Sequence, residues 1–281
     1  MMQQLPFRKY QALGNDYILI DSQHTCSLSE ETIRAICHRT YGVGADGILL
    51  SFTGLRTVSI YNSDGSEAEK SGNGLRIFAY HLIKTAAVEG DHFTICCKAG
   101  VHAVYWDGQK VTINMGSMRS VFDIDSGWQP APISKSLKPQ SFNIDGKQFE
   151  FVAIDIGNPH CVVLNASLDD LQHYGPLIEN HSYFKDRINV QFLHQWDQKA
   201  IGIGIWERGS GHTLSSGSSS CAAFYVAHHL GFCSDQVEVN MEGGQLDLRL
   251  VEDDIWMSGD VKLIASGTIY TDELALEAIN E

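Results

Sequence analysis

Two short serine-glycine turns carry the residue types from which we infer chemistry in this chain. In the first, Ser71, Gly72, Asn73 and Gly74 precede an apolar run with helical spacing. The first N–H groups of a helix have no intrahelical partners, and with the helix dipole they favour a bound phosphate or carboxylate. Taken alone, this turn is as compatible with a purely structural helix cap as with an anion site.

The same arrangement returns in residues 206–227, where Ser216 and Gly217 precede a second apolar helix. Ser216 follows Ser71 at a separation of 216 − 71 = 145 residues. The other landmarks recur at 143 to 145 residues and form these pairs: Asn15 with Asn158, and Asn62 with Glu207. A repeat this long predicts two copies of one half. We expect the halves to be related by a pseudo-twofold axis, with both helix starts facing one cleft.

Composition limits the classes of function. The net charge of −14 and the lack of a lysine or arginine cluster argue against a nucleic-acid partner. No apolar run approaches the ~18 residues of a membrane span. The seven cysteines are odd in number and lie mostly in apolar runs, so we interpret them as reduced residues of a cytoplasmic protein.

The elements that must position the two turns are short. Ser27 and Glu30 suggest a capping box before a helix that buries Ile33 and Ile36. Residues 42–47, GVGADG, match the dinucleotide pattern G-x-G-x-x-G, but a helix precedes them and a strand follows. That order is the reverse of the nucleotide-binding context, so we interpret them as a helix-to-strand turn. The proline-containing stretch from about 119 to 140 has no periodicity and is the best candidate linker.

Many short strands around one long helix per half predict an α+β fold. We expect two pseudo-symmetric halves, each a curled, mostly antiparallel sheet around a central helix. The first half spans residues 1–119 and the second spans residues 120–261. A final strand at about 262–270 returns to the first half.

Seven short motifs then make a family resemblance visible. In chain order they are GND, GADG, NSDGSEAE-x-x-GNG, GNPHC, NVQF, WERG-x-G-x-T and SGSSSCAA. Together they resemble diaminopimelate epimerase over essentially the whole chain. The resemblance implies two barrel-like halves and an epimerase of lysine biosynthesis that needs no cofactor and no metal. It also implies a small amino-acid substrate, L,L- or meso-diaminopimelate, whose α-carbon is inverted by two cysteines, one per half. We leave a homodimer open.

The resemblance also implies a site, residue by residue. Gly72 with Asn73, and Gly217 with Ser218, would hold the reacting α-carboxylate. The distal amino and carboxylate groups would be bound by Asn62, Asn158, Asn189 and Arg208, with Asn15 as a further contact. His160 and Glu207 match the pair that lies beside the catalytic thiols. Arginine suits a carboxylate because its planar fork donates two parallel hydrogen bonds.

The chain departs from the family at the chemistry itself, because Ser71 and Ser216 occupy both catalytic cysteine positions. Gly47 is a milder departure, since some family members have a longer polar residue there. Cys221 lies five residues into the second helix and cannot substitute for Ser216. Three interpretations stay open: an engineered substrate trap, a paralogue that binds amino acids without turnover, or an enzyme in which His160 or Glu207 activates serine, for elimination or for racemisation of another amino acid. We expect binding with little or no turnover.

Overall fold

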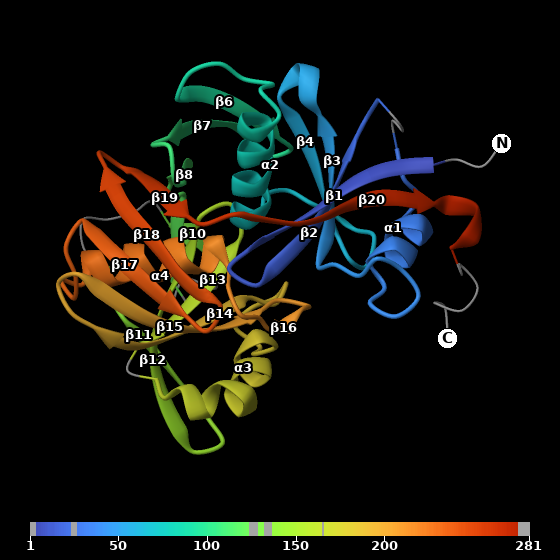
Figure 1. Ribbon diagram of the computed structural model, residues 1–281. Helices are drawn as coiled ribbons and strands as arrows, with labels where there is room; N and C mark the ends of the chain where they lie inside the picture. Colours follow the sequence, from blue (N-terminus) through green and yellow to red (C-terminus); the bar gives the residue numbers. More distant parts are fainter. Residues whose placement is uncertain (1–3, 24–26, 124–128, 132–136, 165, 275–281) are drawn as a thin grey trace. The chain divides into compact units, whose positions relative to one another are not determined.

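Two helices of equal length dominate the computed structural model, which describes residues 4–23, 27–123, 129–131, 137–164 and 166–274. Helix α2 spans Gly72–Lys84 and α4 spans Gly217–His229, 13 residues each (Figure 1). Both begin directly after the serines that the sequence singles out, and their start and end points recur at the predicted separation of 145 residues.

The two helices also end in the same way. After α4, the N–H of Gly231 bonds to the carbonyl of His228, and that of Phe232 bonds to the carbonyl of Ala227. This pair of bonds is the Schellman motif, and Gly231 has the left-handed φ of 79° that the motif requires, as predicted from the sequence. After α2 the equivalent left-handed residue is Ala86, with φ 54°.

The chain divides into two compact units. Unit 1 comprises the described residues of Met1–Ile113 and Gly259–Glu281, and unit 2 is Asn114–Ser258. Each contains one long central helix and one shorter helix. The other elements of each unit are mostly short strands, as expected for the α+β class.

Unit 1 is built on a sheet whose strands pair in the order β20, β1, β2, β3, β4, β6, β7, β8. The pairs β2–β3 and β4–β6 are parallel and the others are antiparallel. Its elements are β1 (Gln4–Ala12), β2 (Asn15–Asp21), α1 (Glu30–Cys37), β3 (Gly47–Phe52), η1 (Thr53–Leu55), β4 (Thr57–Asn62), β5 (Glu67–Ala68), α2, β6 (His92–Cys97), β7 (Gly100–Trp106), the start of β8 (Val111–Ser117), β20 (Lys262–Tyr270) and η3 (Thr271–Glu273).

Unit 2 repeats this pattern of pairing. Its strands pair in the order β12, β13, β14, β15, β17, β18, β19, with β13–β14 and β15–β17 parallel. Both β9 and β11 pair with β12. The elements are β9 (Ser120–Asp123), β10 (Gln129–Ala131), β11 (Gln140–Ile144), β12 (Lys147–Asp155), β13 (Pro159–Leu164), η2 (Leu168–Asp170), α3 (Leu171–Glu179), β14 (Asn189–Trp196), β15 (Ala200–Glu207), β16 (Gly211–His212), α4, β17 (Gln236–Met241), β18 (Gly244–Val251) and β19 (Asp254–Gly259).

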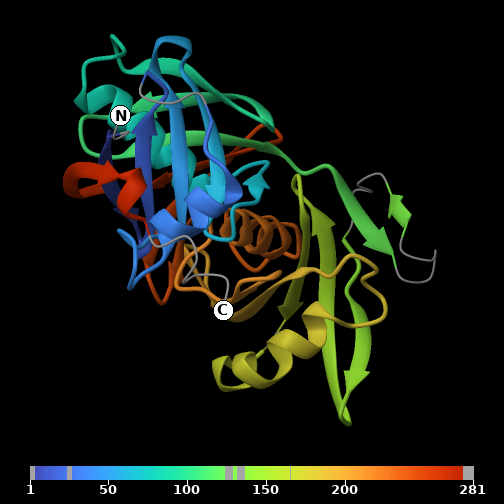
Figure 2. The same ribbon diagram turned by 90° about the vertical axis from the view of Figure 1, so that its right-hand side faces the viewer.

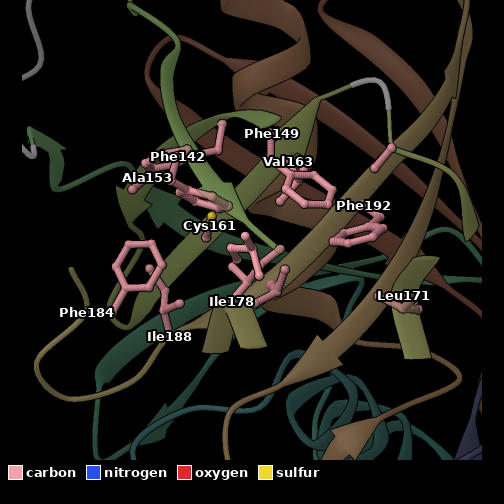
Figure 3. Packing of buried hydrophobic residues seen from close by; sticks show 14 residues of the cluster. Phe142, Phe149, Ala153, Cys161, Val163, Leu171, Ile178, Phe184, Ile188 and Phe192 are labelled. Atoms are coloured by element: carbon pink, nitrogen blue, oxygen red, sulfur yellow. The ribbon is translucent and has the colours of Figure 1, made fainter. Parts of the chain in front are cut away.

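The central strands of unit 2 are buried on both faces because a helix packs on each side. Val190 and Phe192 of β14 belong to an aromatic-rich core with Leu171 and Ile178 of α3 (Figure 3). The intervening Gln191 points to the other face, where it bonds to Ser219 of α4. Figure 2 shows α3 in yellow-green and α4 in orange with the strands of unit 2 between them. The alternation of the strand therefore positions α4 against one face of this sheet.

One expectation from the sequence is wrong. Helix α1 is capped by Ser29, whose Oγ accepts from the N–H of Thr32 at 3.1 Å, and not by Ser27. The capping serine is the one directly before the first helical residue, Glu30. In its described part, the predicted linker contains β9, which pairs with β12 through Phe122 and Ala153. The turn at residues 42–47 is confirmed, since α1 precedes it and β3 follows it.

The described cysteines are all free thiols. Cys221 is buried inside α4, as expected, and Cys26 lies outside the described residues. Among the helices that the structure describes, none has both the length and the apolar character needed to cross a bilayer.

Candidate functional site

Ser71 is the N-cap residue of α2, in unit 1. Its backbone is extended, with φ −134° and ψ 120°, and its Oγ accepts a hydrogen bond from the N–H of Gly74 at 3.1 Å. A serine in this position satisfies one of the unpaired donors of the first turn. Tyr17 of β2 donates a second hydrogen bond to the same oxygen, also at 3.1 Å. The hydroxyl of Ser71 is therefore held from two sides.

A chain of polar side chains fixes the first turn of α2. Nδ2 of Asn73 donates to Oδ1 of Asn15 at 3.1 Å, and Nδ2 of Asn15 donates to Oδ2 of Asp46 at 2.8 Å. The fully buried Arg76 donates to Oδ1 of Asn73 at 2.7 Å. Asn15 therefore connects the first turn of α2 to Asp46 by hydrogen bonds.

A cluster of ion pairs continues this series of hydrogen bonds beyond Asp46. Asp16 accepts from Nζ of Lys9 at 2.8 Å and from Arg39 at 2.9 Å, and Arg39 also reaches Asp46 at 2.6 Å. Burial acts to raise the pKa of Asp16, but the hydrogen bonds from Arg39 and Lys9 outweigh it and hold the pKa below its ordinary value. Asp16 is therefore positioned as a charged acceptor near the start of β2, and Asp46 accepts hydrogen bonds directly before β3.

Asn62 ends β4 opposite Gly47 of β3. Its side chain is exposed and donates to Oγ of Ser66 at 3.0 Å. Asn15 and Asn62 accordingly lie at the same end of three adjacent strands, because β2 and β3 run in parallel and β4 returns beside β3.

Ser216 is the N-cap residue of α4, in unit 2, with φ −147° and ψ 125°. Its hydroxyl donates to Oε2 of Glu207 at 3.0 Å, and the N–H of Ser219 approaches its Oγ at 3.4 Å. Oε1 of Glu207 accepts from the hydroxyl of Thr213 at 2.8 Å. Glu207 ends β15, so this strand delivers a carboxylate to the helix start.

The neighbouring strand starts carry the other predicted residues of unit 2. Asn158 precedes β13, and its Oδ1 lies 2.9 Å from Nε2 of the fully buried His160. His160 pairs in register with Asn189, the first residue of β14, whose Nδ2 donates to the carbonyl of Pro159 at 2.9 Å. Oδ1 of Asn189 accepts from the backbone N–H of Arg208 at 3.0 Å. These residues therefore form one connected set.

The turn that presents Glu207 and Arg208 is held by a buried carboxylate. Oε2 of Glu179, at the end of α3, accepts from Nε1 of Trp206 at 2.8 Å, and its Oε1 accepts from the N–H of Gly209 at 2.9 Å. Glu179 thus bonds to the residues on both sides of Glu207 and Arg208. The guanidinium of Arg208 is exposed and donates to the carbonyl of Asp186 at 3.2 Å.

The predicted residues fall into two sets, one in each unit. Unit 1 carries Ser71, Gly72, Asn73, Asn15 and Asn62. Unit 2 carries Ser216, Gly217, Ser218, Asn158, His160, Asn189, Glu207 and Arg208. Within each unit they share one end of the central helix and the adjacent strand ends.

Three residues at these positions escaped the sequence analysis: Tyr17, Glu179 and Thr213. For Tyr17 a signal existed, because it follows Asn15 as His160 follows Asn158. Thr213 ends the motif WERG-x-G-x-T and so also had a signal, whereas Glu179 had none because it reaches its partners through the fold.

The described residues also line an open pocket of about 640 Å³ in unit 2, between the η2–α3 segment and β15–β17. Its lining includes Leu171, His194, Ile203 and Met241 but none of the predicted site residues. Thr213 also lines it, and its hydroxyl donates to Glu207. Within the part of the chain that the structure describes, no three His, Cys, Asp or Glu side chains come together as a metal site.

Comparison with known proteins agrees with these motifs. The family profile described as diaminopimelate epimerase matches residues 7–121 and 152–264. Diaminopimelate epimerase 2 of a Nostoc species is 40% identical, over 98% of this chain and 99% of its own length. A diaminopimelate epimerase of a Synechococcus species is 36% identical over 95% and 99%, and the chloroplastic protein of Oryza sativa subsp. japonica is 33% identical over 94% and 80%.

Solved structures share the fold at low identity. A hydroxyproline epimerase from Agrobacterium vitis has a TM-score of 0.65 at 11% identity, covering 96% of this chain and 94% of its own. A phenazine biosynthesis protein of the PhzF family from Bacillus anthracis has a TM-score of 0.65 at 16% identity, covering 95% and 99%. These two share the architecture alone, whereas the full-length sequence relatives decide the family. The chain belongs to the diaminopimelate epimerase family.

Proposed function

We propose that this protein is a cofactor-independent isomerase that interconverts L,L- and meso-diaminopimelate. The observation that carries this proposal is the equivalent placement of Ser71 and Ser216. Each is the N-cap residue of a 13-residue helix, and the two helices repeat at the same separation. Inversion of an α-carbon needs two acid/base groups, because a single base returns the proton to the face it left. A duplicated half supplies one such position per copy.

The helix starts supply the binding site for the reacting carboxylate in this proposal. The N–H groups of Gly72, Asn73, Gly217 and Ser218 belong to the first turns, where the helix dipole favours an anion. The distal end of the substrate carries one ammonium and one carboxylate. For these we propose the exposed guanidinium of Arg208 and a set of amides: Asn15, Asn62, Asn158 and Asn189.

The two serines determine the rate that we expect. A thiol ionises near pH 8.5 in model compounds, whereas an alcohol ionises near the ~15.7 of water, a gap of roughly seven units. At about 1.4 kcal/mol per unit, this gap adds on the order of 10 kcal/mol to the formation of the base, or about seven orders of magnitude in rate. His160 and Glu207 recover part of this loss as acid/base groups. We therefore propose a slow epimerase that binds its substrate normally.

The test is incubation with L,L-diaminopimelate in deuterated water, followed by measurement of α-deuteration and of the meso product. We expect slow deuteration from the chain itself and much faster epimerisation from the double variant Ser71→Cys with Ser216→Cys. Each single variant should give at most exchange at one face. A double variant that binds diaminopimelate but neither exchanges nor inverts it would contradict the proposal.

Substrate choice has a separate test. Arg208→Ala should weaken the binding of diaminopimelate by about 100-fold, because a hydrogen bond to a charged group contributes about 1.5–3 kcal/mol. Binding of alanine, which has no distal carboxylate, should change little. Equal losses for both ligands, measured by calorimetry, would show that Arg208 does not bind the distal carboxylate.

We propose further that the protein is a cytoplasmic homodimer. Eight of the nine residues of β20 are exposed in the single chain, including Leu263, Ile264 and Tyr270 at 52%, 54% and 48%. Such an apolar edge is suited to a second copy. Light scattering should give the mass of a dimer for the protein and the mass of a monomer for the variant Ile264→Glu. Cell fractionation tests whether the protein is cytoplasmic.

A further inference from the structure

Tyr17 is a residue whose chemistry the family resemblance does not assign. It lies near the start of β2, is 5% exposed, and its hydroxyl donates to Oγ of Ser71 at 3.1 Å. The N–H of Gly74 donates to the same oxygen at 3.1 Å. A hydroxyl has two acceptor lone pairs and one proton, so these two bonds use both lone pairs of Ser71. The proton of Ser71 is then available to be donated, and the Tyr17 hydroxyl can donate its own proton to Ser71 Oγ.

The hydroxyl of Ser216 has the opposite polarity. It donates its proton to Oε2 of Glu207 at 3.0 Å, and Thr213 holds the other carboxylate oxygen at 2.8 Å. Ser71 therefore receives a hydrogen bond from an acid, whereas Ser216 gives one to a base. The two equivalent serines are set up for opposite directions of proton transfer.

The internal repeat gives Tyr17 a counterpart. Tyr17 follows Asn15 by two residues, as His160 follows Asn158. Both lie near the start of a strand that pairs in parallel with its neighbour, Tyr17 opposite Gly47 and His160 opposite Asn189. Tyr17 thus occupies in unit 1 the position that a titratable histidine occupies in unit 2.

The departure at Gly47 fits this arrangement. A Cβ at Gly47 would lie 2.7 Å from Cε1 of Tyr17 and 2.2 Å from the carbonyl oxygen of Tyr61. Both distances are far below van der Waals contact, so a residue with a side chain would displace the ring or the strand. Glycine at this position leaves the space in which the Tyr17 ring reaches Ser71.

We propose that Tyr17 is the proton donor behind Ser71, acting through it as Glu207 acts through Ser216. This inference rests on the epimerase function proposed above. In one direction, the α-proton passes to Ser216 Oγ while the proton of Ser216 passes to Glu207. On the opposite face, Ser71 gives its proton to the α-carbon while Tyr17 replaces it. Glu207 is then protonated and Tyr17 is a phenolate, and proton exchange with water restores both.

The gain is chemical. A phenol ionises near pH 10 in model compounds, about six units below an alcohol. With a phenol and a carboxylate as the terminal donor and acceptor, neither serine has to exist as a free alkoxide. General acid/base catalysis of this kind contributes about 10²–10⁴-fold in rate.

The matched pair of variants is Tyr17→Phe and Tyr10→Phe. Tyr10 lies opposite Tyr17 in the β1–β2 register, is equally buried, and bonds to His81 at 3.0 Å. Tyr17→Phe should lower kcat for epimerisation by about 100-fold with KM unchanged. It should also retain α-deuteration without inversion for one stereoisomer, because the Glu207 side is intact. Tyr10→Phe should change neither kcat nor the ratio of exchange to inversion. A Tyr17→Phe variant with wild-type kcat would overturn the inference.

A second readout needs no turnover and so separates this inference from the proposed function. In a Ser71→Cys background, the alkylation rate of that thiol by iodoacetamide, followed by peptide mass spectrometry, reports its thiolate fraction. Adding Tyr17→Phe should lower this rate about tenfold near neutral pH, since loss of a hydrogen bond to the thiolate raises its pKa by roughly one unit. An unchanged rate would overturn the inference even if the protein epimerises diaminopimelate. A lowered rate in a protein without turnover would support the Tyr17 contact and contradict the proposed function.

Discussion

Replacement of Glu179 by glutamine tests how the turn at residues 206–209 is held. The carboxylate accepts from Trp206 Nε1 at 2.8 Å and from the N–H of Gly209 at 2.9 Å, and it is 5% exposed. Glutamine has the same shape but only one acceptor oxygen, so its NH₂ group must face one of these two donors. Both hydrogen bonds are partly buried, so the donor that loses its acceptor destabilises the fold by about 1–3 kcal/mol. The loss of charge on the other bond adds about 1 kcal/mol. We expect Glu179→Gln to lower the free energy of unfolding by about 2–4 kcal/mol.

Arg187 provides the matched control. Its guanidinium also bonds to Glu179, at 3.1 Å, but it is 53% exposed. An ion pair of this kind is screened by water and contributes about 0–1 kcal/mol, so Arg187→Met should have a small effect. Urea denaturation of the two variants gives the comparison.

A double-mutant cycle shows which donor matters. Adding Trp206→Phe to Glu179→Gln removes the indole N–H, so the two losses should be non-additive by about 1–2 kcal/mol. The affinity for diaminopimelate should fall in Glu179→Gln because the backbone of Arg208 lies within the loosened turn. The reasoning is refuted if Glu179→Gln destabilises the protein no more than Arg187→Met does.

Two further predictions concern stability. Burial lowers the pKa of His81 to about 4 from its ordinary 6.5. Between these two pH values the unfolded state therefore binds more protons than the folded state. The free energy of unfolding should fall by about 3 kcal/mol as the pH drops from 6.5 to 4. His81→Gln should lack this part of the pH dependence in urea titrations, and an unchanged pH dependence would contradict the assignment. At the ends of the central helices, Ala86→Gly should stabilise the protein by about 1 kcal/mol and Gly231→Ala should destabilise it by a similar amount, because both residues have left-handed φ. Thermal unfolding compares the two variants, and shifts of the same sign would refute this explanation.

The features predicted well from the sequence are those written in local patterns. A serine before an apolar periodic run determined where α2 and α4 begin, and Gly231 marked the end of α4. The repeat between the halves was visible because the same residue types recur at one separation. The roles of the predicted site residues stay predictions.

The features that could not be predicted depend on contacts between distant segments. Tyr17 and Ser71 meet only because β2 passes the start of α2. Glu179 reaches Trp206 and Gly209 only because α3 packs on β15. Strand β9 has four residues and no clear alternation, so its pairing with β12 decides its structure.

Strand β20 gives unit 1 a particular order of assembly during synthesis. Lys9 of β1 pairs with Ala265 of β20, and Leu5 shares a buried core with Ile269. The ribosome makes β1 before unit 2 and β20 after it, so every strand of unit 2 that pairs with β12 is made before β20. Unit 2 can therefore form its core on the ribosome while β1 still has an unpaired edge and part of the unit 1 core is open. A nascent chain in this state exposes a strand edge to other chains until β20 has left the ribosome, so unit 1 is the part most at risk of aggregation up to that point.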